Sequence, residues 1–352
     1  MSRRKDRRGT RAPWALVLLT TLCAELTFTA VAVPWTWLLL PLLMVMYGAG
    51  VLVIREAVVR VGGGWRSLVL LGVAYQIAED GLGLQALTSP RMYDAADWGL
   101  RALGVNWTYW ESQIGVHVVL SVLVPIALVD LLFPERRARP YLGRGGFMGV
   151  GALAIVGVLG LRYVISADQD PGYQTPWGWT AAFVAAIAVL AWLALVATPR
   201  RHLSEHRQGG GTVPRPAIVG FVSLYLTMAF LTTLLPLGLG SELLFGDMMS
   251  PVLRLIIAAM SAVPFGWSVV RWRTAANWSN RHRIWLIGGI LVSHTVFMVP
   301  GSLTAVIIGL PTIAAQVALL VILAKHVGRR DSAGHASSPS RMDPPAAQRV
   351  HG

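Results

Sequence analysis

Long apolar segments follow one another along almost the whole chain, from Trp14 to Lys325. Most are roughly 18 to 23 residues long, about what an α-helix needs to cross the ~30 Å hydrocarbon core of a bilayer. Only 13% of the residues are charged, 55% are hydrophobic and the mean hydropathy is +0.58. A segment in lipid must satisfy its own backbone hydrogen bonds, as a helix does. The sequence therefore predicts an all-α polytopic membrane protein.

We expect about ten transmembrane helices, separated by connections too short to form a soluble domain. The predicted spans are Trp14–Val33, Trp37–Ile54, Trp65–Leu87, Ile114–Phe133, Gly146–Ser166, Gly178–Ala197, Ala217–Pro236, Val252–Val270, Ile284–Val299 and Leu303–Lys325. The count depends on the tight turns at Pro34 and Pro300 being true turns rather than re-entrant hairpins.

Lysine and arginine are distributed unevenly between the two sides of this topology. With the N-terminus inside, all 30 of these residues except Arg91, Arg101, Arg162 and Arg254 lie on the inner side. Basic residues that flank short loops resist translocation, so the distribution predicts that both ends of the chain are cytoplasmic. It also favours anionic lipid at the cytoplasmic face of the bilayer.

The composition sets further limits on partners and location. The net charge of +13 would suggest a nucleic-acid partner in a soluble protein, but no recognition fold accompanies it, so we expect none. The preference for arginine over lysine indicates a bacterium of high genomic GC content, and the predicted location is the cell (cytoplasmic) membrane. Cys23 is the one cysteine, which excludes a disulfide bond within the chain.

The parts of the chain outside the helices differ in composition. We expect residues 14–325 to form the transmembrane domain, preceded by a basic cytoplasmic N-terminus at 1–13. The other predicted segments are an aromatic-rich outer loop at 88–111, a cytoplasmic linker at 199–216 and a disordered cytoplasmic tail at 327–352.

Five ionisable residues fall well inside the predicted spans, namely Glu25, Glu79, Asp80, His117 and His294. A charged group at such a position costs about 2.5 to 3.5 kcal/mol and normally faces the bundle interior, beside a partner. At the ~1.5 Å rise per residue of an α-helix, the five lie in the middle and outer third of the membrane. We therefore expect a polar site in the outer half of the membrane, in a cavity open to the outside.

The third predicted span carries the most polar face. Gly72, Gln76, Glu79 and Gly83 follow at i, i+4, i+7 and i+11, which places them on one face of an α-helix. Asp80 lies about 100° further round the helix. Two adjacent acids in a low dielectric cannot both ionise cheaply, so one is expected to hold a proton and to exchange it near neutral pH.

Charged residues near the helix ends are assigned to the membrane interface. Arg55 and Glu56 lie at a predicted inner helix end, where snorkelling brings the charge to water. Arg254 lies near a predicted outer end, where its guanidinium could also hold an anionic substrate or pair with Glu79 or Asp80.

Three functions are compatible with this pattern. The leading hypothesis is permease-like transport of a small solute, in which the Glu79/Asp80 pair exchanges protons or binds a cation. The second is a membrane-embedded hydrolase in which Glu79 activates water, with His117 and His294 as metal ligands or charge stabilisers, so a divalent metal is a possible cofactor. The third is a non-catalytic assembly subunit whose polar groups join helices. The candidates for substrate or ion binding are Glu25, Gln76, Arg254 and His294.

The positions of Glu79, Asp80 and His117 resemble the motifs of the CAAX-protease-like membrane enzymes. Those enzymes carry a Glu-Glu-xxx-Arg motif, then Phe-xxx-His, then a further histidine motif, and they cleave near the membrane. Here Asp80 is the second acid, Leu84 stands at the arginine position and Gln113 at the phenylalanine position. The resemblance covers two of the predicted helices and implies the hydrolase hypothesis, with His294 as the third element.

Overall fold

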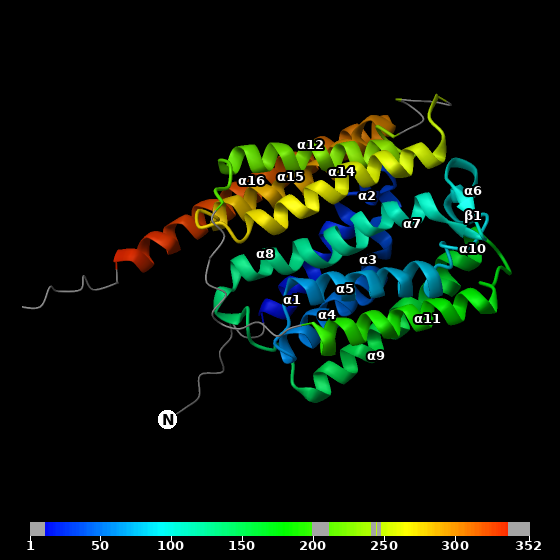
Figure 1. Ribbon diagram of the computed structural model, residues 1–352, viewed down its shortest axis with the longest axis horizontal. Helices are drawn as coiled ribbons and strands as arrows, with labels where there is room; N and C mark the ends of the chain where they lie inside the picture. The colour runs from blue at the N-terminus through cyan, green and yellow to red at the C-terminus, as the bar shows by residue number, and fades with distance from the viewer. Residues whose placement is uncertain (1–10, 199–210, 241–243, 245–247, 337–352) are drawn as a thin grey trace, which may run out of the picture.

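In the computed structural model, long helices run roughly side by side and form a bundle (Figure 1). The structure describes residues 11–198, 211–240, 244 and 248–336, with side chains up to residue 330. Within these residues, eight helices are long and apolar enough to span a membrane. They are Pro34–Arg60, Trp107–Leu132, Arg144–Gln169, Trp177–Ala197, Pro216–Leu234, Pro251–Trp272, Asn280–Gly301 and Leu303–Arg330. The prediction of an all-α polytopic membrane protein is confirmed.

Many of the spans change helix type along their length. The first elements are α1 (Arg11–Thr21), η1 (Leu22–Leu26), α2 (Thr29–Ala32), η2 (Pro34–Leu39), α3 (Leu40–Leu43), η3 (Met44–Gly48), α4 (Ala49–Arg60), α5 (Trp65–Gln76) and η4 (Ile77–Gly83). They are followed by η5 (Met92–Asp94), α6 (Ala95–Trp98), β1 (Arg101–Ala102), β2 (Val105–Asn106), α7 (Trp107–Gln113), η6 (Ile114–Leu123) and α8 (Val124–Leu132).

The remaining elements complete the bundle. They are η7 (Pro134–Arg136), α9 (Arg144–Leu161), η8 (Arg162–Ser166), α10 (Ala167–Gln169), α11 (Trp177–Trp192), η9 (Leu193–Ala197), α12 (Pro216–Leu234), α14 (Pro251–Trp272), α15 (Asn280–Met298), η11 (Val299–Gly301) and α16 (Leu303–Ala336). The segments η1, η3, η4, η6, η8 and η9 are π-helical, and η2, η5, η7 and η11 are 3₁₀ helices.

Two further helical segments in the bundle are less suited to lipid than the eight spans. The first helix is interrupted after Leu26, where Phe28 has φ −126° and ψ −88°, outside the helical region. The helix Trp65–Gly83 carries Arg66, Glu79 and Asp80 within its length. The two segments match the first and third predicted spans, so a total of ten spans, with both chain ends in the cytoplasm, stays a prediction.

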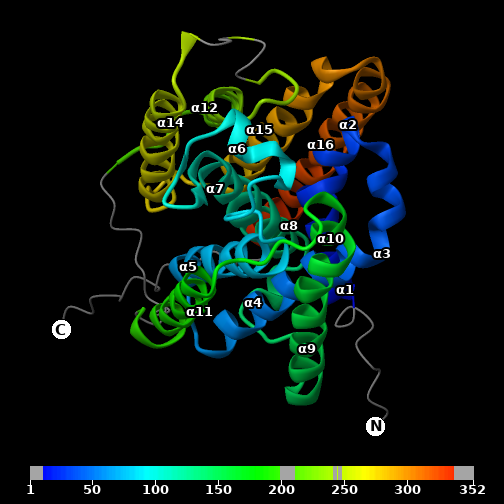
Figure 2. The same cartoon turned by 90° about the vertical axis from the view of Figure 1, so that its right-hand side faces the viewer.

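The helices form two groups, which Figure 2 shows as a lower and an upper set. In the N-terminal group, α5 packs against η6 and α11, and α4 packs against α9. In the C-terminal group, α12 packs against α14 and α15, and α15 packs against α16. A buried apolar cluster that includes Leu120, Val124, Ile287 and Leu323 joins the two groups.

Small residues allow the closest helix contact in the C-terminal group. Gly289 of α15 lies directly against the Gly220 carbonyl and the Ser223 side chain of α12. Ser223 donates a hydrogen bond across this contact to the carbonyl of Leu286, at 3.1 Å. Glycine permits such an approach because it has no Cβ, and small residues are enriched at helix contacts in membranes for this reason.

The connection after η4 is folded rather than irregular. Gln85 has φ +61°, a left-handed conformation that is uncommon outside glycine and that ends the helical path. A small hairpin follows, in which Arg101 of β1 pairs with Asn106 of β2. Helix α7 begins at Trp107, so the fourth span starts inside the segment 88–111 that was predicted to be an outer loop.

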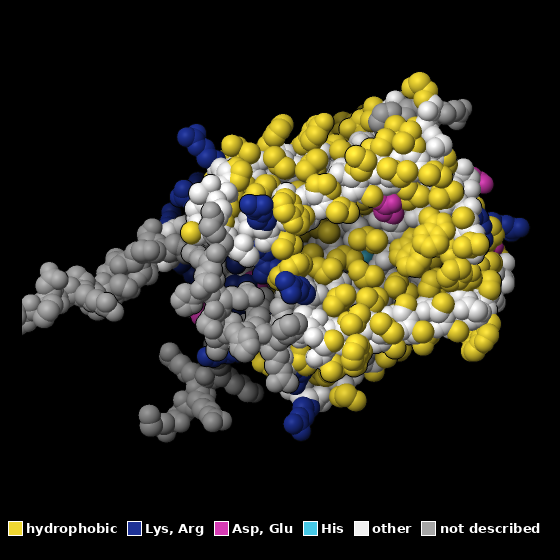
Figure 3. Space-filling view, in the orientation of Figure 1, with side chains coloured by type: hydrophobic (Ala, Val, Ile, Leu, Met, Phe, Trp, Pro, Cys, Tyr) yellow, Lys and Arg dark blue, Asp and Glu magenta, His cyan; other side chains and the backbone are white. Residues whose placement is uncertain are grey.

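The surface distinguishes the two ends of the bundle. Hydrophobic side chains cover the face in Figure 3, whereas Lys and Arg gather at its left end, which we call the basic end. The loop 134–143 and the start of α9 lie at the basic end, and α10 lies at the opposite end (Figure 1). The predicted tail beyond residue 336, linker residues 199–210 and N-terminal residues 1–10 lie outside the described residues.

Candidate functional site

Polar side chains from four π-helical turns meet in the N-terminal group of helices. Glu25 lies on η1, Tyr47 on η3, Glu79 and Asp80 on η4, and His117 on η6. A π-helical turn is wider than an α-helical turn and shifts the side chains that follow it, and such turns occur frequently at functional sites. The convergence of four of them marks this cluster as the candidate site.

His117 lies between the two adjacent acids. Its Nδ1 atom is 3.3 Å from Oε2 of Glu79, and its Nε2 atom is 3.4 Å from Oδ2 of Asp80. The structure thus brings together the three residues that the sequence singles out as catalytic candidates. Because both ring nitrogens face carboxylates, a protonated imidazole can pair with two negative charges at once.

Tyrosine side chains complete the cluster. The hydroxyl of Tyr47 donates to Oε1 of Glu25 at 2.7 Å, and the hydroxyl of Tyr109 donates to Oδ1 of Asp80 at 2.9 Å. The Tyr47 ring stacks on the His117 ring with 5.8 Å between centroids, and the Tyr75 ring meets His117 edge-on at 6.4 Å. These aromatic rings fix the plane of the imidazole and exclude water from its faces.

The centre of the cluster, at Glu79, Asp80 and His117, is closed to solvent, whereas Glu25 is partly exposed. Glu79, Asp80 and His117 are 1%, 0% and 3% exposed, so the expected cavity open to the outside is absent at these residues. Both carboxylate oxygens of Glu79, Oδ2 of Asp80 and Nδ1 of His117 have no hydrogen bond of good geometry. Buried polar atoms are nearly always satisfied, and the ion-pair contacts of His117 with the two acids stabilise three of these four atoms.

Glycines bring neighbouring helices close to the acidic turn. Gly81 contacts the ring of Phe183 on α11, and Gly83 contacts the backbone of Val158 on α9. A Cβ at Gly83 would lie 2.6 Å from the Val158 carbonyl oxygen, which is closer than real contacts allow. The sequence places Gly83 on the same helix face as Glu79, and the structure shows that this glycine seals the cluster against α9.

Gln76 contacts an aromatic residue rather than the acids. Its side-chain amide donates to the backbone carbonyl of Trp110 at 3.3 Å and accepts from the Trp110 indole at 3.1 Å. This reciprocal pair joins α5 to α7 one turn before Glu79. Gln76 thus supports the site by positioning the helices.

Arg254 and His294 lie on the C-terminal group of helices. Arg254, near the start of α14, donates from Nε to the carbonyl of Met249 at 3.1 Å. His294, on α15, has Nδ1 2.7 Å from the Ile290 carbonyl, and its ring meets Phe28 edge-on at 5.3 Å. His294 thus packs at the break in the first helix, beyond the turn that carries Glu25. His294 is the third element that the CAAX-protease-like resemblance implies, and the contacts described for it do not include His117.

The arrangement of acids and histidines indicates whether the site suits a metal ion or a proton. Among the residues that the structure describes, no three His, Cys, Asp or Glu side chains are arranged to bind a metal ion. The arrangement around His117 suits proton exchange between carboxylates and imidazole, because each ring nitrogen faces a carboxylate oxygen.

Comparison with known proteins agrees with the fold. Residues 15–333 match the model of a family described as an uncharacterized membrane protein family. The chain belongs to this family. No curated protein and no solved structure matches it. For this family member, the physical evidence on function is therefore the geometry of its own polar residues.

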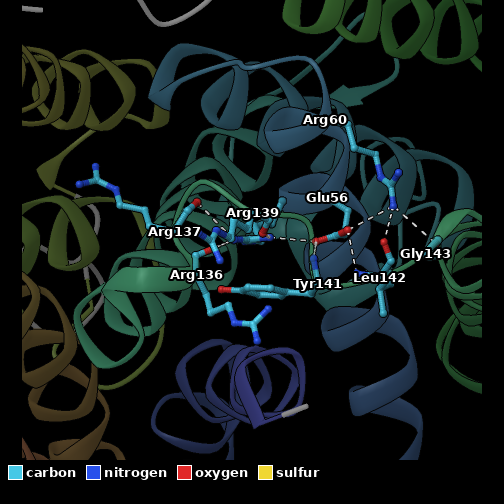
Figure 4. Close-up of polar contacts among 9 residues, drawn as sticks. Glu56, Arg60, Arg136, Arg137, Arg139, Tyr141, Leu142 and Gly143 are labelled. Carbon is cyan, nitrogen blue, oxygen red and sulfur yellow. Dashed lines mark hydrogen bonds and ion pairs between the residues drawn. The ribbon is translucent and has the colours of Figure 1, made fainter. Parts of the chain in front are cut away.

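A second polar network of this family member lies at the basic end, around Arg55 and Glu56 of α4 (Figure 4). The two residues are 2% and 0% exposed and form an ion pair at 2.9 Å, so the expectation that they snorkel to water is wrong. Glu56 accepts from the backbone N–H groups of Tyr141 and Leu142 at 2.7 and 3.2 Å. The partners of this pair come from the loop 134–143 rather than from solvent.

Arg55 holds the same loop from the other side. Its guanidinium donates to the carbonyls of Arg136, Arg137 and Arg139 at 2.7 to 3.2 Å. It also stacks over the ring of Tyr141, 3.4 Å from the centroid. Burial raises the pKa of the Tyr141 phenol to about 12, so the ring stays neutral beneath the cation. The network clamps the loop that joins α8 to α9.

Sequence reasoning missed the tyrosines and this network. Tyr47, Tyr75 and Tyr109 lie in apolar surroundings, where an aromatic residue gives no sign of a polar role. The one available signal was proximity, because Tyr75 precedes Glu79 by one helical turn. Backbone carbonyls, which bind Arg55, carry no sequence signal at all.

Proposed function

We propose that this protein is a proton-coupled permease-like transporter of a small solute, with Glu79, Asp80 and His117 as its protonatable site. The observation that carries the proposal is the position of His117, whose two ring nitrogens each face a buried carboxylate. Taking up or releasing a proton at this site changes the balance between attraction and repulsion inside a low dielectric, where such changes are large.

The charge balance of the cluster supports proton exchange. Glu25, Glu79 and Asp80 supply three carboxyl groups, and His117 is the one imidazole beside them. Three carboxylates and one imidazolium would place a net negative charge in a largely buried site, which is costly. We therefore expect the cluster to hold at least one carboxyl proton at rest and to exchange it when the site opens.

Tyrosine and carboxyl side chains lie in series between the surface and the cluster. Tyr93, partly exposed at the end opposite the basic end, stacks on Tyr109 with 5.9 Å between the ring centroids. Tyr109 donates to Asp80, which lies beside His117. Glu79 follows, and Tyr47 donates onward to Glu25. The contact between Tyr93 and Tyr109 is ring stacking, so the hydrogen-bonded parts of this series are the tyrosine–carboxyl contacts at Asp80 and Glu25.

The break in the first helix supports a link between protonation and movement. Thr295 of α15 donates to the free carbonyl of Thr27 at 2.6 Å, and Gln316 of α16 donates to Thr295 at 2.9 Å. The C-terminal group thus holds the first helix directly after Glu25. Interrupted helices with exposed backbone carbonyls line the substrate and ion sites of many transporters, where one group of helices moves against another.

The hydrolase hypothesis receives less support from the geometry. His117 directs both nitrogens to carboxylates, which leaves neither free to bind a metal while those contacts persist. His294 contacts Phe28 and a backbone carbonyl instead of joining Glu79. A water-activating role for Glu79 would also need an entry path for substrate, whereas the cluster is closed.

Solute-driven charge movement tests the proposal. The full-length protein is reconstituted in vesicles on a solid-supported membrane, and a panel of amino acids, sugars, organic acids and amines is applied at several pH values. We expect at least one class of solute to evoke a current that reverses when the proton gradient is reversed. A panel that gives no current above protein-free vesicles, or currents that are insensitive to pH, would contradict the proposal.

A further inference from the structure

A cavity of about 460 Å³ lies at the end of the bundle opposite the basic end. It lies beside η8 and α10, and the segment that leads into α11 closes one side. Its lining includes Gln85, Arg162, Asp170 and Gln174. We infer that this cavity binds the phosphate headgroup of a membrane phospholipid, with Arg162 as the anion-binding residue. The size is within the range of about 300 to 1,000 Å³ that is usual for ligand sites.

Arg162 presents a positive charge without an acid beside it. Its guanidinium donates to the side-chain oxygens of Gln85, at 3.0 Å, and Gln174. Among the residues that the structure describes, no carboxylate forms an ion pair with Arg162. A guanidinium near hydrocarbon is costly without a counter-charge, and its fork of N–H donors matches phosphate oxygens. Because these bonds go to neutral side-chain oxygens, the charge of Arg162 remains available to an anionic ligand.

The cavity wall behind Arg162 is rigid. The side-chain oxygen of Gln85 also accepts from the backbone N–H of Thr175 at 2.8 Å. Its amide nitrogen donates to the Ser166 hydroxyl and to the Tyr173 carbonyl, both at 3.2 Å. Gln85 is buried and has a left-handed backbone conformation, which persists because the surrounding contacts fix it. This network pre-organises the guanidinium, which lowers the entropy cost of binding.

The rim of the cavity identifies the source of the phosphate. Leu159 and Tyr163 also line the cavity and are 47% and 79% exposed on the apolar outer surface of the bundle. A free phosphate ion would gain nothing from these side chains, whereas acyl chains would pack against them. Tyrosine is enriched at headgroup depth, because its ring is apolar and its hydroxyl is polar. The rim therefore favours a lipid over a free anion.

Asp170 indicates which class of lipid headgroup fits the cavity. It is buried in the cavity lining, and its Oδ2 accepts from the Ser89 hydroxyl at 2.6 Å. Its Oδ1 is 4.0 Å from the exposed side chain of Arg91. A lining with a guanidinium and a carboxylate complements a headgroup that has a phosphate and an ammonium, as phosphatidylethanolamine does.

Thermal unfolding of the delipidated protein in detergent tests the inference. Short-chain phosphatidylethanolamine is added to the wild type, Arg162→Gln, Arg162→Lys and Arg144→Gln. Arg144 is exposed at the other end of the same helix and serves as the matched control. We expect the lipid to raise the unfolding midpoint of the wild type and of R144Q, to act weakly on R162K, and to leave R162Q unchanged.

Two further additions separate the possible sources of the anion. Inorganic phosphate and phosphoethanolamine, which have no acyl chains, are expected to give less than a tenth of the lipid response at equal concentration. An equal response to inorganic phosphate would overturn the assignment to lipid. A lipid response in R162Q as large as in the wild type would overturn the role of Arg162, and both results are independent of solute transport.

Discussion

Replacing Glu79 with glutamine is expected to abolish solute-driven proton movement while the protein remains folded. Glutamine has nearly the shape of glutamate but cannot release a proton, so the His117 imidazole loses one of its two acidic partners. With a solute that evokes a current in the wild type, the current of Glu79→Gln should fall to the level of protein-free vesicles. The unfolding midpoint should change little, because Asp80 remains as an acidic partner of His117 and glutamine creates no cavity.

Asp168→Asn is the control for this experiment. Asp168 is exposed on α10 and contributes no contact to the cluster, so its amide variant should transport as the wild type does. Retention of the coupled current in E79Q would contradict the role assigned to Glu79. A large fall in its unfolding midpoint would instead support the hypothesis that the polar residues only join helices.

Replacing Glu56 with alanine is expected to produce the largest loss of stability. The substitution removes the acceptor of the Tyr141 and Leu142 amides and leaves the Arg55 guanidinium buried without its acid. Removing one partner of a buried ion pair typically costs about 3 to 5 kcal/mol. Denaturant unfolding in detergent should show this loss, and hydrogen exchange should accelerate at the amides of residues 141 and 142.

Glu135→Gln is the matched control for the loss of an ion pair. Glu135 pairs with Arg330 at 2.8 Å, but its side chain is largely exposed. Exposed pairs contribute about 0 to 1 kcal/mol, so this variant should unfold close to the wild type. Similar stability of Glu56→Ala and Glu135→Gln would refute the view that the Arg55–Glu56 pair clamps the loop 134–143.

The membrane class and the acids and histidine of the candidate site could be predicted from hydropathy, whereas the tyrosines of the site could not. An acid or histidine in a long apolar segment needs a partner, which identified Glu79, Asp80 and His117 before any contact was known. The prediction holds for residues far apart in the chain, because each ionisable side chain in an apolar segment needs a polar partner. Eight of the predicted spans correspond to apolar helices long enough to cross a membrane, because the bilayer sets the length of an apolar segment.

The local distortions of the helices could not be predicted. The first helix breaks at Thr27 and Phe28, although neither glycine nor proline occurs between Glu25 and Val33. Tertiary contacts supply the missing explanation, because Thr295 satisfies the carbonyl that the break sets free. The sequence also gives no sign of the π-helical turns. These turns determine which side chains face the cluster.

The environment of charged residues was also beyond sequence reasoning. Arg55 and Glu56 sit at a helix end, where snorkelling is the ordinary outcome, yet a loop covers them and supplies backbone partners. His294 lies at a depth similar to that of the acids but on a helix of the other group, where it contacts Phe28. Depth along a helix follows from spacing, whereas the neighbour across the bundle follows only from packing.

Infrared difference spectroscopy of the reconstituted protein tests the central claim most directly, because it detects protonated carboxyl groups inside the membrane. The pH is stepped between about 5 and 8, around the ordinary pKa of histidine. The account predicts a carboxyl band that changes with pH in the wild type, changes differently in Glu79→Gln and is strongly reduced when Asp80→Asn is added, with Glu25 as the carboxyl group of the cluster that remains. A spectrum that shows no buried carboxyl exchanging protons, or one that the double substitution leaves unchanged, would contradict it.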